Sequence, residues 1–179
     1  FVRDHESGPL SALSVNDGFR VFPSTRSNLA AVPAEEPATH AARVLADLLA
    51  ERGVKVGGEV RTGSAPADGV ELAAITSAPV TEVVGQMLAA SDNTTAELLI
   101  KELGVATAGE GSTAAGVAAA MEVLRADGVA VDGIVLNDGS GLDRGDRLTC
   151  NALVTMLDNA GPASALANGL AVAGERGTL

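Results

Sequence analysis

The scarcity of aromatic side chains is the feature that most limits what this sequence can fold into. The chain has no Trp and no Tyr, and its three Phe residues, Phe1, Phe19 and Phe22, all lie near the N-terminus. Hydrophobic residues still make up 46% of the 179 positions, so the chain is apolar enough to bury a core. Ala, Val and Leu must fill that core. Small side chains favour helices that approach one another closely over thick layers of large side chains.

Charge and residue counts exclude several classes of function. The formal net charge is −11 and the isoelectric point is near 4.5, which argues against nucleic acid as a partner because phosphate binding depends on Lys and Arg. The single cysteine, Cys150, has no partner for an intrachain disulfide, and His5 and His40 lack the spacing of metal ligands. No apolar run approaches the roughly 18 residues of a transmembrane helix. We therefore expect no nucleic acid, no metal site and no transmembrane segment in this chain.

Hydrophobic periodicity predicts an α+β fold in which helices outnumber strands. Apolar residues recur at helical spacing in five segments, some of them bounded by Pro, Gly or a capping residue. The predicted helices span residues 38–52, 80–90, 95–103, 112–126 and 150–157. Short apolar stretches between turn residues predict strands. These strands are one or two within residues 7–37, one each at 54–63 and 70–79, and a buried one at 133–136.

Three polar residues, Ser91, Asp92 and Asn93, stand together immediately before a predicted helix. Thr94 and Glu97 fit a capping box, in which a hydroxyl and a carboxylate satisfy unpaired N–H groups of the first turn. Ser91 and Asn93 remain unexplained by that interpretation. Residues two apart in an extended or turning segment project to the same side, so a proton-relaying hydroxyl and an amide-binding carboxamide could face one cleft. The alternative is that both are ordinary polar residues of a loop before a helix.

Several oxygen-bearing side chains crowd the segment LNDGSGLDRGDRLT, residues 136–149, and invite a calcium-binding interpretation. A calcium loop requires an oxygen ligand at its fifth position and Gly at its sixth, where this chain has Leu and Asp. We prefer a tight turn after a strand. In that turn Gly139 and Gly141 would take positive φ, and Asp138 would accept hydrogen bonds from nearby amides.

The segment GEGSTA, residues 109–114, matches the form of a dinucleotide-binding motif at the start of a helix. That motif follows a strand, and no strand is predicted here. We therefore interpret Ser112 as a helix N-cap and expect no bound nucleotide.

Three segments, in this order and at these separations, resemble one known family: AASDNTTAELLIKELG, LNDGSGLDRGDRLT and VAGERGTL. Together with weaker flanking similarity over about residues 9–179, they look like the D-alanyl-D-alanine carboxypeptidase/endopeptidase family of low-molecular-mass penicillin-binding proteins. The resemblance implies part of a penicillin-binding protein/β-lactamase-like transpeptidase fold, mostly its helical region with a few strands. That family uses three active-site motifs, Ser-x-x-Lys, Ser-x-Asn and Lys-Thr-Gly. Only the second is present, as Ser91, Asp92 and Asn93.

The resemblance also implies roles for these residues. The Ser91 hydroxyl would join the lysine of the first motif in a relay that returns a proton to the departing D-alanine amine. The Asn93 carboxamide would hold a carbonyl of the stem peptide or the side-chain amide of a penicillin, whereas Asp92 would brace the turn. Acyl-enzyme chemistry of this kind implies no metal or organic cofactor. The expected partners are peptidoglycan D-alanyl-D-alanine stem peptides and β-lactams.

The missing motifs indicate a truncated domain. Neither Lys55 nor Lys101 has a Ser three residues earlier or Thr-Gly after it, and the RTGS at 61–64 precedes the SDN segment, which is the wrong order. We expect the nucleophile upstream of Phe1 and the Lys-Thr-Gly motif downstream of Leu179. The isolated 179-residue chain should then be inactive.

The expected setting is the periplasm or cell envelope, where the family works. Residues 1–37 would join from an upstream domain, and residues 38–179 would form the central part of the penicillin-binding domain, truncated before its C-terminal strands. An alternative class stays open, a non-catalytic envelope interaction module that kept the fold without the nucleophile. The adjoining coding sequence would decide between them. A more remote alternative is an Ala-rich scaffold without a site, in which Ser91 and Asn93 would point into solvent without sharing a concavity.

Overall fold

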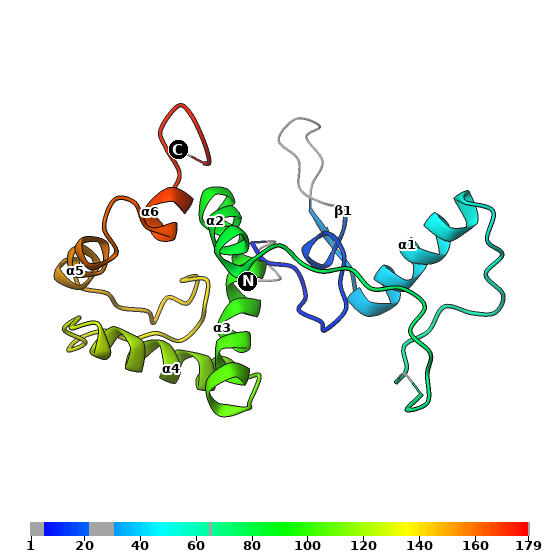
Figure 1. The fold of residues 1–179 in the computed structure, drawn as a ribbon, viewed down its shortest axis with the longest axis horizontal. Helices are drawn as coiled ribbons and strands as arrows, with labels where there is room; N and C mark the ends of the chain where they lie inside the picture. The colour runs from blue at the N-terminus through cyan, green and yellow to red at the C-terminus, as the bar shows by residue number, and fades with distance from the viewer. Residues whose placement is uncertain (1–5, 22–30, 65, 179) are drawn as a thin grey trace. The chain divides into compact units, whose positions relative to one another are not determined.

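The computed structural model describes residues 6–21, 31–64 and 66–178, and the chain forms two compact units, Phe1–Thr76 and Ser77–Leu179 (Figure 1). Among the described residues, the first unit holds short β structure and one long helix, and the second holds five helices. The boundary predicted after residue 37 concerns domains of the complete protein and stays a prediction.

The first unit begins with a short antiparallel ribbon that leads into a helix. Its described elements are η2 (Asn16–Gly18), β1 (Phe19–Val21), β2 (Val32–Pro33) and α1 (Pro37–Glu51). Phe19 of β1 lies opposite Pro33 of β2 and is only 4% exposed. The prediction of one or two strands within residues 7–37 is therefore confirmed. Phe1 and Phe22 lie outside the described residues.

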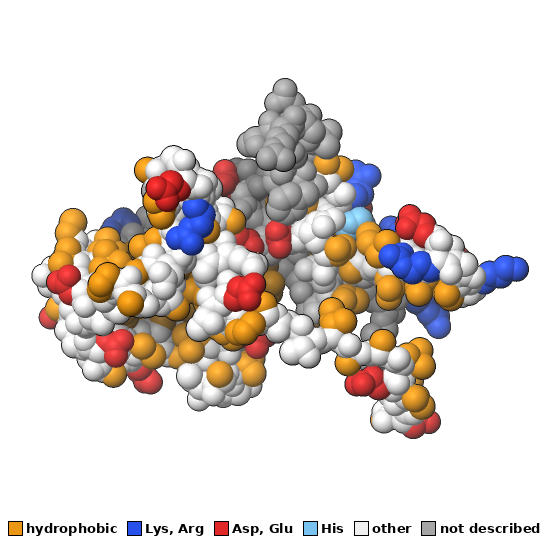
Figure 2. Space-filling model, turned by 45° about the horizontal axis from the view of Figure 1, so that its top comes forward, with side chains coloured by type: hydrophobic (Ala, Val, Ile, Leu, Met, Phe, Trp, Pro, Cys, Tyr) orange, Lys and Arg blue, Asp and Glu red, His pale blue; other side chains and the backbone are white. Residues whose placement is uncertain are grey.

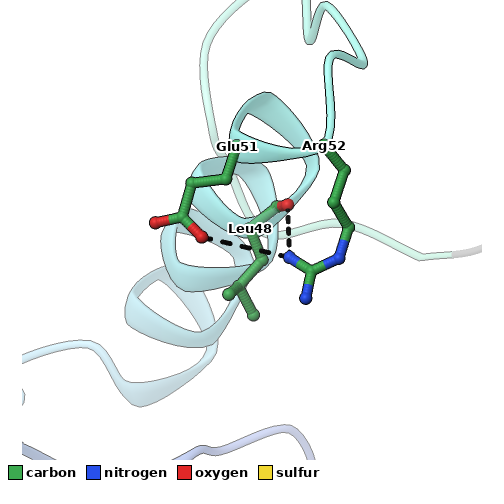
Figure 3. Close-up of polar contacts among 3 residues, drawn as sticks. All are labelled: Leu48, Glu51 and Arg52. Carbon is green, nitrogen blue, oxygen red and sulfur yellow. Dashed lines mark hydrogen bonds and ion pairs between the residues drawn. The ribbon is translucent and has the colours of Figure 1, made fainter.

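Helix α1 confirms the predicted helix to within one residue at each end. It begins at Pro37, and proline is favoured in the first turn because its missing N–H would be unpaired there anyway. At the other end, Nη1 of Arg52 donates to the carbonyl oxygen of Leu48 at 2.8 Å and lies 4.0 Å from Oε2 of Glu51 (Figure 3). The hydrogen bond satisfies a terminal carbonyl and the charge complements the helix dipole. The ion pair adds little, because both of its side chains are mostly exposed.

The strands predicted at 54–63 and 70–79 are wrong, because the structure describes all residues of both segments and neither forms a strand. Val70, Leu72 and Ile75 are instead 83%, 95% and 99% exposed. Their pattern suits a strand, but a strand is stable only when its backbone pairs with a neighbour. Figure 2 shows hydrophobic side chains on the surface over α1 and the chain that follows it.

The second unit is a group of closely packed helices. They are α2 (Val80–Ala90), α3 (Asn93–Ala108), α4 (Thr113–Ala126), α5 (Cys150–Ala160) and α6 (Ala165–Gly169). All four helices predicted here are confirmed, although α3 runs over 93–108 rather than 95–103. Helix α3 packs against α4, and α2 packs against α6. A Cβ atom on Gly116 of α4 would stand 1.8 Å from the carbonyl oxygen of Ile100 in α3, so this approach depends on glycine.

The core of the second unit is small and aliphatic, as the composition predicts. Its buried members are Val129, Ile134 and Ala152, surrounded by Met121, Leu124, Val131, Leu136 and Met156. The buried strand predicted at 133–136 is wrong: the described chain has only an isolated antiparallel bridge there, between Val135 and Arg147, and Val135 is 45% exposed. The ladder stops because the next N–H group, that of Asn137, donates to the Asp146 side chain instead of to a backbone carbonyl.

Candidate active site

The SDN segment forms the short turn between α2 and α3. Ser91 ends α2 in the left-handed region, with φ 55° and ψ 48°, and Asp92 is extended, with φ −82° and ψ 100°. Asn93 is then the first residue of α3. A left-handed backbone is unfavourable for a residue with a Cβ atom, and such conformations concentrate at functional sites. Left-handed residues also end many helices, and Ser91 ends α2 in this way and so sets the direction in which the chain enters α3.

Asp92, not Thr94, caps helix α3. Its Oδ1 accepts from the Thr95 N–H at 3.0 Å and its Oδ2 accepts from the Thr95 hydroxyl at 2.5 Å. The predicted capping box of Thr94 and Glu97 is therefore wrong, and Thr94 lies inside the helix, only 4% exposed. Aspartate two residues earlier provides an equally good cap and starts the helix sooner. Asp92 thus braces the turn, the task that the family resemblance implies for it.

Ser91 and Asn93 lie on either side of this cap. Ser91 is exposed and Asn93 is partly buried. The turn brings the two residues together at the junction of α2 and α3, with Asp92 between them. That their side chains face one shared depression stays a prediction.

Glu97 makes contacts that the sequence did not indicate. Its side chain is buried, 7% exposed, and its Oε1 accepts from the Gly139 N–H at 3.1 Å, the Ser140 N–H at 3.0 Å and the Ser140 hydroxyl at 2.7 Å. These partners lie more than 40 residues away, so no local pattern identifies them. The burial of Glu97 in the structure is what points to these contacts, because a buried carboxylate requires several hydrogen-bond donors.

The loop that Glu97 holds is organised by a second buried carboxylate. Asp138, 9% exposed, accepts from the Gly141 N–H at 2.6 Å and the Asp143 N–H at 2.7 Å, which confirms the predicted tight turn. Gly141 has the predicted positive φ, 75°. Gly139 does not have positive φ, so that prediction is wrong. Glycine is required there for close approach, since a Cβ atom would lie 2.5 Å from the carbonyl oxygen of Ala96 in α3.

A third carboxylate in this loop, that of Asp146, has a raised pKa. Oδ1 of Asp146 accepts from the Asn137 N–H at 2.7 Å and from its side-chain amide at 3.1 Å. Partial burial raises the pKa of Asp146, and the neighbouring Asp138 raises it further, while the hydrogen bonds from Asn137 oppose the change.

Within the described residues, no group of three or more His, Cys, Asp or Glu side chains is placed to hold a metal ion. No helix in the described parts of the chain is long and apolar enough to cross a membrane.

The fold is that of a penicillin-binding protein. The chain superposes on penicillin binding protein 4 (dacB) of Haemophilus influenzae with a TM-score of 0.68 and 23% identity, over 84% of this chain and 36% of that one. The chain belongs to the D-Ala-D-Ala carboxypeptidase 3 (S13) family, whose sequence profile matches residues 21–179. The family and the fold class predicted from the sequence are both confirmed.

Two curated relatives agree with this assignment. The chain is 41% identical over 132 residues to a D-alanyl-D-alanine carboxypeptidase of Actinomadura sp. strain R39, a match that covers 72% of this chain and 24% of that protein. It is 35% identical over 183 residues to a carboxypeptidase of Mycobacterium tuberculosis, covering 99% of this chain and 38% of that protein. The chain therefore spans well under half the length of either relative.

Proposed function

We propose that residues 1–179 are part of a serine-type D-alanyl-D-alanine carboxypeptidase/endopeptidase. It would act on peptidoglycan stem peptides through an acyl-enzyme, be acylated by penicillins, and work in the periplasm or cell envelope. The observation that carries the proposal is the SDN turn, with Ser91 in a left-handed conformation between two helices of a chain that belongs to this family. The names of the relatives, carboxypeptidases in both cases, support the reaction class.

In this mechanism the described residues handle protons and carbonyl groups and do not attack the substrate. A nucleophilic serine supplied by the first motif would form the acyl-enzyme and expel D-alanine, and the Ser91 hydroxyl would pass a proton toward the departing amine. The Asn93 carboxamide would orient the peptide carbonyl. Lys101 is assigned no part in this relay, because no Ser stands three residues before it, and its Nζ donates to the Thr113 hydroxyl at 2.9 Å between α3 and α4.

The experiment that tests this function uses the complete protein that carries this sequence. Two quantities are measured: release of D-alanine from an acylated D-alanyl-D-alanine peptide, and covalent labelling by a fluorescent penicillin. Both should be observed, with one penicillin bound per protein. If neither occurs, the non-catalytic envelope module becomes the better account.

The isolated chain provides a second prediction. Residues 1–179 should form no covalent adduct with penicillin, because a serine hydroxyl is a weak nucleophile until a neighbouring base takes its proton. Denaturing electrophoresis and intact mass measurement after incubation would detect an adduct. Stoichiometric labelling of this chain would contradict the assignment of the nucleophile to another part of the protein.

A further inference from the structure

A buried acid links the helix of the candidate site to a distant loop. Glu97 lies four residues after Asn93 in α3, so both lie on one face of the helix, and Ile100 continues that face. The loop packs against the same face, because a Cβ atom on Gly139 would stand 2.8 Å from Cγ2 of Ile100. The loop at 138–143 therefore lies along the helix face that begins with Asn93.

Two carboxylates hold this loop in different ways. Asp138 shapes the loop from within, accepting from the N–H groups of Gly141 and Asp143. Glu97 holds the loop from outside, accepting from both backbone N–H groups and the hydroxyl of residues 139–140. Without the Glu97 carboxylate, the loop would keep its own turn and lose the hydrogen bonds that attach it to α3. The three hydrogen bonds to Glu97 thus add to the packing of Gly139 against α3 and attach the loop to the helix that begins with Asn93.

We propose that Glu97 is a positioning residue of the active site, which attaches the loop at 138–143 beside Asn93 and so fixes one wall of the substrate site. The proposal rests on the proposed function, because it takes Ser91 and Asn93 as site residues. Glu97 is assigned no proton transfer and no contact with the reacting atoms. Its loss should therefore weaken substrate positioning more than it slows the chemical steps.

The experiment compares Glu97→Ala and Glu97→Gln in the complete protein with Glu102→Ala, which changes an exposed glutamate of the same helix. Steady-state kinetics on a D-alanyl-D-alanine peptide give KM and kcat separately. Glu97→Ala should lower kcat/KM about 10- to 100-fold, mainly through KM, since small displacements of site groups have effects of this size. Glu97→Gln keeps an acceptor oxygen and should recover most of the loss. Glu102→Ala should match the unmodified protein.

Amide hydrogen exchange supplies a readout that does not depend on catalysis. Exchange at residues 139 and 140 should accelerate at least about tenfold in Glu97→Ala, because these N–H groups lose their acceptor, and should stay unchanged in Glu102→Ala. If Glu97→Ala does not fold, Ser140→Ala removes one of the three hydrogen bonds to Glu97, together with the longer one to Asp138 at 3.3 Å, and should raise KM about threefold.

Each result has a defined consequence. A folded Glu97→Ala protein with unchanged KM and kcat overturns the positioning role, as does a loss in kcat alone that Glu97→Gln fails to restore. An unmodified protein that neither releases D-alanine nor binds penicillin refutes the proposed function and, with it, an active-site role for Glu97. Exchange then decides separately whether Glu97 attaches the loop to α3, and unchanged exchange overturns that attachment.

Discussion

Four of the five described helices in the second unit begin at a side-chain cap, which α2, after Pro79, and α1 of the first unit both lack. In the second unit, α3, α4, α5 and α6 each start at a side chain that accepts a hydrogen bond from the backbone N–H three residues later, at 3.0 to 3.1 Å. These N-caps are Asp92, Ser112, Thr149 and Ser164. In the described part of the first unit, α1 follows Glu36, whose side chain makes no capping hydrogen bond. The chain after α1 then leaves large apolar side chains exposed.

This difference shows which parts of the chain are specified locally. A cap joins residues three apart, so a short sequence pattern is enough to identify the candidates for it. A strand requires a second segment at the right register, and the apolar pattern of residues 70–76 says nothing about where that segment is. We therefore expect substitutions within the helices of the second unit to change its free energy of unfolding. The stability of residues 70–76 should depend chiefly on contacts with other segments.

The largest expected effect tests whether the second unit carries the catalytic turn. In the complete protein, Ser91→Ala should lower the rates of penicillin acylation and deacylation about 10²- to 10⁴-fold, the usual loss when a proton-transfer group is removed. Stopped-flow acylation kinetics measure this. Ser77→Ala, a change at an exposed serine before α2, is the matched control and should have no effect. Unchanged acylation in Ser91→Ala would count against the relay.

Asn93→Ala should show a different kinetic pattern from Ser91→Ala. Loss of the carboxamide should mainly raise KM for peptide and weaken penicillin binding, because the role proposed for that group is to position the substrate and not to transfer a proton. Asn151→Ala, at an exposed position in the first turn of α5, is the corresponding control. If kcat alone falls in Asn93→Ala, the positioning role assigned to Asn93 is wrong.

The next effect concerns the close packing of helices in the second unit. Gly116→Ala would place a methyl group 1.8 Å from the carbonyl oxygen of Ile100, so α3 and α4 must move apart. We expect the free energy of unfolding to fall by about 3 kcal/mol, measured by denaturant titration. Gly85→Ala in α2 is the control, since its Cβ atom would meet only the Cα of Gly169 at 3.8 Å. It should be neutral or stabilise by up to about 1 kcal/mol, and equal losses in both variants would contradict this account.

The same contrast between local patterns and distant contacts explains which features of the structure the sequence predicted. The bounds of α2 are predicted correctly because its apolar periodicity ends at the SDN turn, and the local pattern identifies Ser112 as a cap. The start of α3 was misplaced because Asp92 and Thr94 are both good caps and only the fold chooses between them. The role of Glu97 was missed because its partners lie more than 40 residues away.

A smaller effect tests the contrast between capped and uncapped helices directly. Ser112→Ala removes the side-chain oxygen that accepts from the Ala115 N–H at 3.1 Å, and should lower the free energy of unfolding by about 1 kcal/mol. Glu36→Ala makes a change at the equivalent position of α1, which has no capping hydrogen bond from its side chain, and should stay within about 0.5 kcal/mol of the unmodified protein. Thermal or denaturant unfolding measures both. A larger loss at Glu36 would reverse the contrast.

The smallest expected effect is a pH dependence in the loop at 136–149. The pKa of Asp146 is raised by partial burial and by the nearby Asp138, so the folded state holds this proton more tightly than the unfolded chain does. Stability contributed by this group is therefore present at low pH and falls as pH rises through the raised pKa. Ionised Asp146 should destabilise the fold slightly at neutral pH.

Asp146→Asn tests that sign, because asparagine cannot titrate there and still offers an oxygen to the Asn137 N–H. Free energies of unfolding should be measured by urea titration at pH 4 and pH 7, with Asp158→Asn, a change at an exposed aspartate of α5, as the control. The stability of Asp146→Asn relative to the unmodified protein should increase from pH 4 to pH 7, whereas Asp158→Asn should show no such trend. A relative stability that decreases over this interval would mean that the hydrogen bonds from Asn137 outweigh burial and lower the pKa of Asp146.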